Sequence, residues 1–228
     1  MRSLKKQTFI IGLYFLFHLN MKCLFKKLFI IEGNIGAGKS TLLKLIEKAI
    51  PNSIILGEPV TEWKNMGGDN LLNCFYSEPK RWCFTFEVCS MISKLKNLKE
   101  ALKSDFEYIF MERSLFSDKA FHQISYFLEK IDSKEMKILQ DLYNNFKLEY
   151  PCPNGVIYIK TDIKTCLKRI KERGRKEEQG ITEDYLKKLG DQLITIEYKS
   201  PILQIDGNYD IKRSQMLIQN IKEFIKLN

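Results

Sequence analysis

Residues 33–40, GNIGAGKS, have the types and spacing of a phosphate-binding loop. They fit the complete pattern G-x-x-x-x-G-K-[ST] between an apolar run and a helical stretch. A glycine-rich turn with a chance lysine is the alternative, and the complete pattern disfavours it. Lys39 can reach the outer phosphates of a nucleoside triphosphate, ATP or another, and the Ser40 hydroxyl can bind Mg²⁺. The residues expected to hold the triphosphate are Gly33, Asn34, Ile35, Gly36, Ala37, Gly38, Lys39, Ser40 and Thr41.

Two carboxylates end apolar runs elsewhere in the chain, Glu58 in SIILGE and Glu112 in EYIFME. Ligands of parallel sheets lie outside the carboxyl ends of the strands, so both acids are expected beside the phosphate loop. Phosphoryl transfer to a hydroxyl needs a group that orients and deprotonates it, and cations that neutralise the moving charge. Glu58 can be the base, Glu112 can hold Mg²⁺ directly or through water, and Arg113 can clamp the acceptor or the γ-phosphate. Either Glu alone would more often be a surface residue, but two at equivalent strand ends favour function.

The segment KRIKERGRKEEQG, residues 168–180, gathers Arg169, Arg173 and Arg175 around Gly174. Such a run is usually a solvated charged face. Its position after a helix, with a glycine hinge, favours an arginine-bearing lid that closes over phosphates, because the forked guanidinium suits phosphate oxygens.

Alternating strands and helices must position these residues. Five short apolar runs are continuous, as expected for strands buried on both faces. The expected strands are 28–33, 53–58, 107–112, 155–160 and 201–206. The expected helices are 39–50, about 79–103, 114–149 with a break near 132–133, 163–173, 182–199 and 214–227. This order predicts an α/β fold, a five-stranded parallel sheet flanked by helices, in one domain over residues 28–228.

Charge and cysteine content limit the classes of function. The formal net charge is +9, but +6 of it falls within residues 1–31, so little remains for a duplex-binding surface. The six cysteines form no C-x-x-C pair, which favours reduced thiols in the cytoplasm. No nucleic acid and no stable membrane association are expected.

Residues 1–27 are basic and partly apolar, with the run FIIGLYFLFHL at 9–19. That run is too short to span a bilayer, and no small-residue cleavage site follows it. We interpret residues 1–27 as a dispensable extension, with Met21 as a candidate start. Mitochondrial targeting is the alternative.

Five motifs in order, GNIGAGKST, EPVTEW, RWCFTFE, ERSLFSD and RGRKEEQG, resemble the deoxynucleoside kinase family, in particular its deoxycytidine/deoxyguanosine kinase branch. The resemblance covers almost everything from Leu28 onward. It implies transfer of the γ-phosphate of ATP or another NTP to the 5′-hydroxyl of a deoxynucleoside, with Mg²⁺, in a homodimer. It also implies that Glu58 is the base at that hydroxyl, that Arg113 lies beside it and that Glu112 is the metal-site acid. The further residues it implies are Tyr76 and Glu178 at the sugar 3′-hydroxyl, Val60, Trp63 and Phe86 as nucleoside-pocket walls, and the lid arginines Arg169, Arg173 and Arg175.

Two departures from the family bear on the base of the nucleoside. Glu87 stands where the family has Gln, and Lys94 stands where the branch has Arg, with Asp118 as the partner of that cation. An ionised Glu87 only accepts hydrogen bonds, which suits the N1–H and N2–H₂ donors of guanine, while Lys94 can meet O6. We therefore expect deoxyguanosine to be favoured, unless burial protonates Glu87 and so admits cytosine or adenine. The alternative is that Glu87 pairs with Lys94 and points away from the substrate.

A further departure is His122, where the branch has a Phe that stacks on the base. An imidazole can also stack, and no chemical role is assigned to it.

Two other classes remain open. A thymidylate kinase-like enzyme would phosphorylate a nucleoside monophosphate and would need a basic site for its phosphate. A non-catalytic nucleotide-binding or nucleic-acid-binding module would make Glu58 dispensable and would bind polynucleotides in a strongly salt-dependent way.

Overall fold

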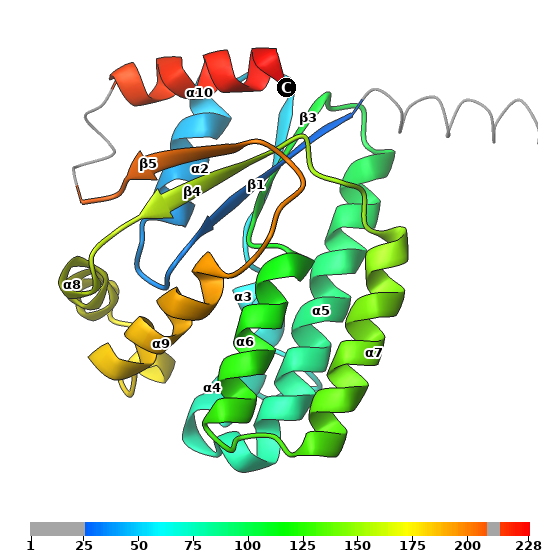
Figure 1. Cartoon of the computed structure of the whole chain (residues 1–228), viewed down its shortest axis with the longest axis vertical. Helices are drawn as coiled ribbons and strands as arrows, with labels where there is room; N and C mark the ends of the chain where they lie inside the picture. The colour runs from blue at the N-terminus through cyan, green and yellow to red at the C-terminus, as the bar shows by residue number, and fades with distance from the viewer. Residues whose placement is uncertain (1–25, 209–214) are drawn as a thin grey trace, which may run out of the picture.

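Five parallel strands form the sheet of the computed structural model, which describes residues 26–208 and 215–228. The strand order is β2-β3-β1-β4-β5, with β1 in the centre (Figure 1). The strands are β1 Lys27–Gly33, β2 Ser53–Leu56, β3 Tyr108–Glu112, β4 Gly155–Lys160 and β5 Ile202–Asp206. The α/β fold with a five-stranded parallel sheet is therefore confirmed.

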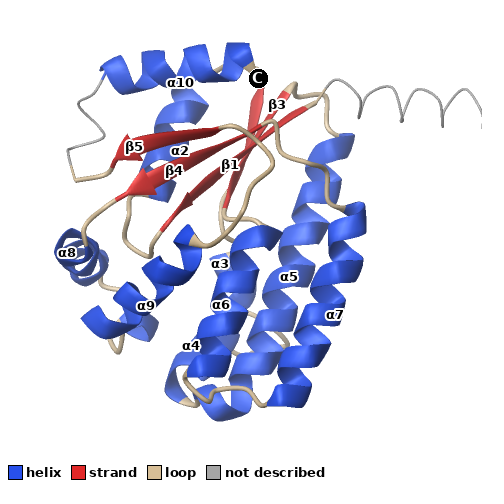
Figure 2. Cartoon of the chain, in the orientation of Figure 1, coloured by secondary structure: helices blue, strands red, loops and turns tan. Residues whose placement is uncertain are grey.

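Helices connect successive strands and cover both faces of the sheet (Figure 2). The long helices α5, α6 and α7 run side by side. The helices are α2 Lys39–Ala49, α3 Val60–Trp63, α4 Leu71–Ser77, α5 Pro79–Lys103, α6 Leu115–Phe127, α7 Ser133–Glu149, α8 Ile163–Arg173, α9 Glu183–Ile194 and α10 Gln215–Leu227, with the 3₁₀ helix η1 at Lys176–Glu178.

The main differences from the sequence expectation are two element ends and two additional helices. Strand β2 ends at Leu56, not at residue 58, because Gly57 and Pro59 follow and proline cannot donate a hydrogen bond to a neighbouring strand. Helices α3 and α4 were not expected, since both are short and lie in a loop-like segment. Helix α9 ends at Ile194, not at residue 199, because the chain turns so that the Tyr198 ring packs on another aromatic side chain, 5.6 Å between ring centroids.

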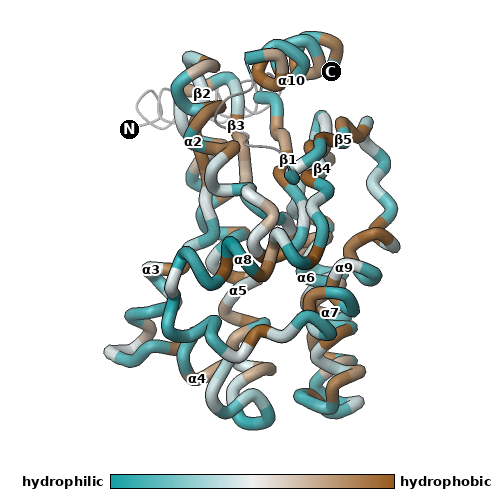
Figure 3. The backbone as a smooth tube through the Cα atoms, turned by 90° about the vertical axis from the view of Figure 1, so that its left-hand side faces the viewer, coloured by the Kyte–Doolittle hydropathy of each residue, from teal (hydrophilic) through white to brown (hydrophobic). Residues whose placement is uncertain are grey.

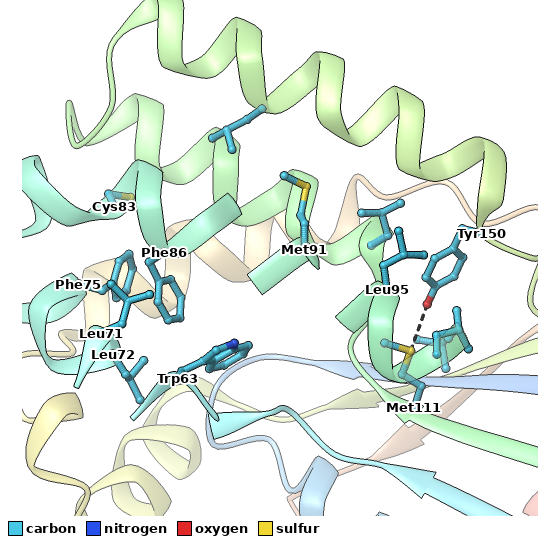
Figure 4. Packing of buried hydrophobic residues seen from close by; sticks show 14 of the residues in the cluster. Trp63, Leu71, Leu72, Phe75, Cys83, Phe86, Met91, Leu95, Met111 and Tyr150 are labelled. Carbon is cyan, nitrogen blue, oxygen red and sulfur yellow. Dashed lines mark hydrogen bonds between the residues drawn. The ribbon is translucent and has the colours of Figure 1, made fainter. Parts of the chain in front are cut away.

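The alternating strand residues build two separate hydrophobic layers. Leu28 and Ile30 of β1 face a layer formed with α4, α5 and α7, whereas Phe29 and Ile31 face a layer formed with α2, α8 and α10. Figure 4 shows the first layer, in which the Tyr150 hydroxyl donates to the Met111 sulfur. Helix α8, in contrast, is mostly hydrophilic along its length (Figure 3). The sheet is thus fixed from both sides, and its carboxyl edge can hold a rigid site.

The predicted extension, residues 1–27, lies almost entirely outside the described residues, as does Cys23. The five described cysteines are all free. Within 26–208 and 215–228, no helix is long and apolar enough to cross a membrane.

Candidate active site

Glycine is required at two points of the loop between β1 and α2. The backbone φ angle is 143° at Gly33 and 78° at Gly36, values that residues with a Cβ rarely adopt. A Cβ on Gly33 would lie 2.6 Å from the carbonyl oxygen of Ile159, and one on Gly36 would lie 2.5 Å from that of Cys166. The loop therefore packs directly on β4 and α8 and leads into the N-terminus of α2, a geometry that suits phosphate binding.

Two polar side chains fix this loop from inside. The Nζ atom of Lys39, a residue only 4% exposed, donates to the backbone oxygens of Asn34 at 2.8 Å and Gly33 at 3.2 Å. Burial and the nearby Arg113 cation lower the pKa of Lys39 to about 8. The Asn34 side chain donates to the backbone oxygen of Leu186 in α9, at 2.7 Å. Of the expected triphosphate-binding residues, Asn34 thus uses its side chain to anchor the loop to α9.

Arg113 is the most constrained residue of the site. It is 2% exposed and has a φ angle of 61°, an uncommon conformation for a residue with a side chain. Its Nε atom lies 2.7 Å from Glu58 Oε1, and its Nη1 donates to the backbone oxygen of Gly33 at 3.2 Å. The guanidinium carbon also lies 4.7 Å from the ring centroid of Phe121. A strained backbone held by contacts on every side points to a functional position.

The carboxyl of Glu58 is kept ionised by its neighbours. Burial pushes its pKa upward, but the charges of Arg113 and Lys39, together with those of Lys94 and Arg175, outweigh burial and lower the pKa. Glu58 follows β2 and is half-buried, so that it lines the cavity at the carboxyl edge of the sheet. An ionised, oriented carboxylate of this kind can accept a proton from a hydroxyl.

Oxygen ligands for a divalent cation meet beside the loop. The Ser40 hydroxyl donates to Glu112 Oε2 at 2.9 Å, and Lys39 Nζ lies 3.9 Å from Glu112 Oε1. Burial and the negative charge of Glu58 raise the pKa of Glu112, so a cation would favour its carboxylate form. Among the described residues no group of three or more His, Cys, Asp or Glu could hold a metal ion. One carboxylate and one hydroxyl fit Mg²⁺, which usually keeps waters and takes further ligands from phosphates.

A cavity runs from the phosphate loop into the space between α3, α4, α5 and α6. Its wall is aromatic, with ring centroids 5.1 Å apart for Trp63 and Phe86 and 4.5 Å apart for Phe75 and Phe86 (Figure 4). Trp63 Nε1 donates to Ser93 Oγ at 3.0 Å, which fixes the indole. The lining residues are Ile35, Gly36, Lys39, Glu58, Val60, Trp63, Leu72, Phe75, Tyr76, Phe86, Glu87, Ser90, Lys94, Glu112, Arg113, Asp118, Phe121, Arg173, Arg175, Glu178 and Tyr185.

The arginines expected in a lid lie on α8 and just after it. Arg173 and Arg175 both pair with Glu178, Arg175 Nη1 at 2.9 Å from Oε1. Arg169 Nη1 donates to the backbone oxygen of Ala37 in the phosphate loop, at 3.0 Å. All three arginines line a second hollow, which they share with Gly36, Gly38, Lys39, Ser40, Thr41, Lys44, Glu112 and Glu172. That hollow adjoins the phosphate loop and the N-terminus of α2.

Glu177 ties the segment with the arginines to the opposite rim. Its Oε1 accepts from Lys64 Nζ and from Asn70 Nδ2, both at 2.8 Å. These hydrogen bonds lower the pKa of Glu177 to about 2. We call the three residues Lys64, Asn70 and Glu177 the lid latch.

At the far end of the cavity, Lys94 pairs with Asp118, as expected from the sequence. Glu87 lines the cavity and does not point away from it. His122 is 2% exposed but is absent from the cavity wall, and its Nε2 lies 3.6 Å from Glu87 Oε2. Its neighbour Phe121 lines the cavity instead.

The structure thus brings the expected site residues together, apart from His122. Sequence reasoning missed Leu72, Phe75, Ser90, Phe121 and Tyr185 in the cavity wall and Lys44 beside the phosphate loop. Helical spacing alone could not separate Phe121 from His122, since adjacent residues on α6 differ by 100° and either could face the cavity. Phe75 and Leu72 lie on the unexpected helix α4.

A phosphate loop, a carboxylate paired with an arginine and a cavity with aromatic walls at the carboxyl edge of a parallel sheet define a P-loop phosphotransferase. Comparison with known proteins agrees: the family model "Deoxynucleoside kinase" matches residues 29–226. The chain is 33% identical to deoxycytidine kinase 2 of Gallus gallus, over 86% of this chain and 89% of that protein. It is 32% identical to deoxycytidine kinase of Homo sapiens, over the same shares, and 32% identical to mitochondrial deoxyguanosine kinase of Xenopus laevis, over 71% and 69%. The chain belongs to the deoxynucleoside kinase family.

Proposed function

We propose that this protein transfers the γ-phosphate of ATP, or of another NTP, to the 5′-hydroxyl of a deoxynucleoside. The observation that carries the proposal is the Glu58–Arg113 pair, 2.7 Å apart, between the phosphate loop and an aromatic cavity. The phosphate of a nucleoside monophosphate would lie next to the γ-phosphate of the donor and would need free cations there, whereas Arg113, Arg173 and Arg175 are each paired with a glutamate of the cavity wall. An uncharged hydroxyl acceptor suits that arrangement.

In the proposed mechanism, Glu58 accepts the proton of the 5′-hydroxyl while the hydroxyl oxygen attacks the γ-phosphorus. The bond from the γ-phosphorus to the oxygen bridging to the β-phosphate breaks, and the nucleoside diphosphate leaves with that oxygen. Arg113 orients Glu58 through Nε and lies close to the transferring group. Lys39 and the lid arginines Arg169, Arg173 and Arg175 stabilise the charge on the phosphoryl oxygens.

Mg²⁺ fits beside the phosphate loop, where Ser40 and Glu112 would hold it. When bound, it would neutralise charge on the phosphates of the donor. Tyr76 and Glu178 are proposed to bind the sugar 3′-hydroxyl, since both line the cavity and the Glu178 carboxylate is already fixed by two arginines.

The acceptor is proposed to be a purine deoxynucleoside or deoxycytidine, in keeping with the names of the relatives above. Lys94, Asp118 and Glu87 would read the base edge. Deoxyguanosine is favoured if Glu87 is ionised, and deoxycytidine or deoxyadenosine if it carries a proton.

An assay that couples ADP formation to NADH oxidation tests the proposal, with each of the four deoxynucleosides and deoxyguanosine monophosphate as acceptors. We expect turnover with at least one nucleoside. Turnover with only the monophosphate would support a thymidylate kinase-like enzyme instead. Salt-sensitive polynucleotide binding without turnover would support a non-catalytic nucleic-acid-binding module.

We also propose a homodimer in the cytoplasm. Helices α5 and α7 expose apolar side chains, among them Ile92 and Leu148, which are 51% and 86% exposed. Light scattering on the purified protein tests the dimer, and the coupled assay on a variant that begins at Met21 tests the dispensability of residues 1–20. A monomer at every concentration, or an inactive truncated variant, would refute the respective proposal.

A further inference from the structure

A buried polar cluster closes the far end of the cavity between α5 and α6. Glu87, 3% exposed, accepts at Oε1 from Ser125 Oγ at 3.2 Å. Its Oε2 lies 3.6 Å from Nε2 of His122, and that nitrogen has no hydrogen-bond partner among the described residues. Glu87 is thus a cavity-lining carboxyl held from behind by two α6 side chains that carry no fixed charge.

The nearest cation is engaged elsewhere. Lys94 lies two turns after Glu87 on the same face of α5 and forms its ion pair with Asp118, both groups being deeply buried. The other oxygen of that aspartate, Oδ2, is buried and has no hydrogen-bond partner within the described ranges. The cavity end therefore presents one free acceptor, on Asp118, beside the carboxyl of Glu87.

Several other titratable groups act on Glu87. From α5 they are Cys83 and Lys94, from α6 Asp118 and His122, from the loop after α6 Lys130, and from α9 Tyr185. Asp118 opposes ionisation of Glu87, whereas Lys94 and Lys130 favour it. Because Lys94 is bound to Asp118, its charge offsets only part of the effect of burial on Glu87. Glu87 can therefore gain or lose its proton within the pH range of an assay.

We propose that Glu87 is a two-state reader of the base, a proton donor toward cytosine or adenine when it is neutral and an acceptor pair toward guanine when it is ionised. The proposal rests on the function proposed above and specifies its substrate range. Cytosine and adenine place an acceptor ring nitrogen beside an exocyclic amino group. A neutral Glu87 donates to that nitrogen, and the free oxygen of Asp118 accepts from the amino group. When Glu87 ionises, it loses the O–H that donates to cytosine or adenine. Its two carboxylate oxygens remain as acceptors for the N1–H and N2–H₂ groups of guanine.

The protonation states agree with this assignment. Burial, then the negative charge of Asp118, raises the pKa of Glu87 to about 8. Burial and the charge of Lys94 lower the pKa of His122 to about 3, so His122 stays neutral and supplies no counter-charge. Glu87 is therefore neutral below about pH 8 and ionised above it. The base preference should move from cytosine toward guanine as the pH rises through that value.

The test is the ratio of kcat/KM for deoxycytidine to kcat/KM for deoxyguanosine, measured with saturating Mg²⁺ and ATP between about pH 6.5 and about pH 9. Both substrates react through the same Glu58 and the same phosphate loop, so titration of those groups cancels in the ratio. We expect the ratio to fall about tenfold or more, since a buried hydrogen-bonding group left unpaired costs that much.

Two variants separate Glu87 from other groups. Glu87→Gln has no titrating carboxyl at this position, so its ratio should change with pH only as far as titration of the nucleosides themselves changes it. The ratio of the wild type is therefore divided by that of the variant at each pH. Ser125→Ala removes a donor that favours the carboxylate, so the fall of the ratio should move to higher pH.

A constant ratio in the wild type while both nucleosides are turned over would overturn the inference and leave the proposed function standing. An equal change in wild type and Glu87→Gln would do the same. Absence of turnover with every nucleoside at every pH would overturn the proposed function, and the inference with it.

Discussion

The two ends of the cavity contain similar charged groups, but the pKa of the carboxyl is lowered at one end and raised at the other. At the phosphate end, Arg113 lies directly on Glu58 and lowers its pKa despite burial. At the base end, the lysine lies on Asp118, and Glu87 is left with a pKa raised to about 8. Burial acts to raise the pKa of both carboxyls, and only at Glu58 does a cation placed directly on the carboxyl reverse that effect, so that one carboxyl can act as a base and the other as a neutral hydrogen-bonding group.

The largest expected effect is at the phosphate end. Glu58→Gln removes the proposed proton acceptor and should lower kcat by about 10²–10⁴-fold, the usual scale of general-base catalysis. Steady-state kinetics with the best nucleoside measure it. Glu62→Gln is the matched control, since this residue lies on α3 four positions away and outside the cavity wall. Near-wild-type turnover of Glu58→Gln would show that another group takes the proton.

Arg113→Lys should follow, with a loss of about 10²–10³-fold in kcat, because lysine keeps the charge but cannot contact Glu58 and the Gly33 oxygen through a planar fork. The exposed Arg81, which stacks on Trp82, offers the control Arg81→Lys. Equal losses of kcat in Arg113→Lys and Arg81→Lys would show that the planar guanidinium of Arg113 has no specific role in the reaction.

The lid latch lies outside the cavity wall, so we expect a smaller effect when it is removed. Glu177→Gln should raise the KM for the nucleoside about threefold to thirtyfold, since it weakens charged hydrogen bonds to Lys64 and Asn70. Because the pKa of Glu177 is about 2, the latch is ionised across the working range. A double-mutant cycle with Lys64→Met checks it. Additive effects would mean that the two residues do not act as a unit.

The smallest effect concerns the donor side. Since the pKa of Lys39 is lowered to about 8, this lysine is charged below that pH and loses its proton above it. The value of kcat/KM for ATP should therefore decline by up to about tenfold per pH unit above that point, because this parameter follows the free enzyme. A pH profile that stays level to about pH 9 would contradict the assignment.

The sequence predicted the phosphate end better than the base end. The loop is continuous in the chain, and Glu58 and Glu112 follow strands whose carboxyl ends must meet at one edge. The base end depends on packing between α5 and α6. Whether Phe121 or His122 faces the cavity, and whether the buried lysine pairs with Asp118 or Glu87, follows from helix rotation and side-chain contacts that spacing alone leaves open.

Infrared difference spectroscopy of the carboxyl groups tests the contrast between the two ends most directly. At about pH 7, we predict a neutral-carboxyl band that Glu87→Gln removes and Glu58→Gln leaves unchanged. The Glu87 band should disappear as the pH rises past about 8. A band lost in Glu58→Gln and retained in Glu87→Gln would contradict the account.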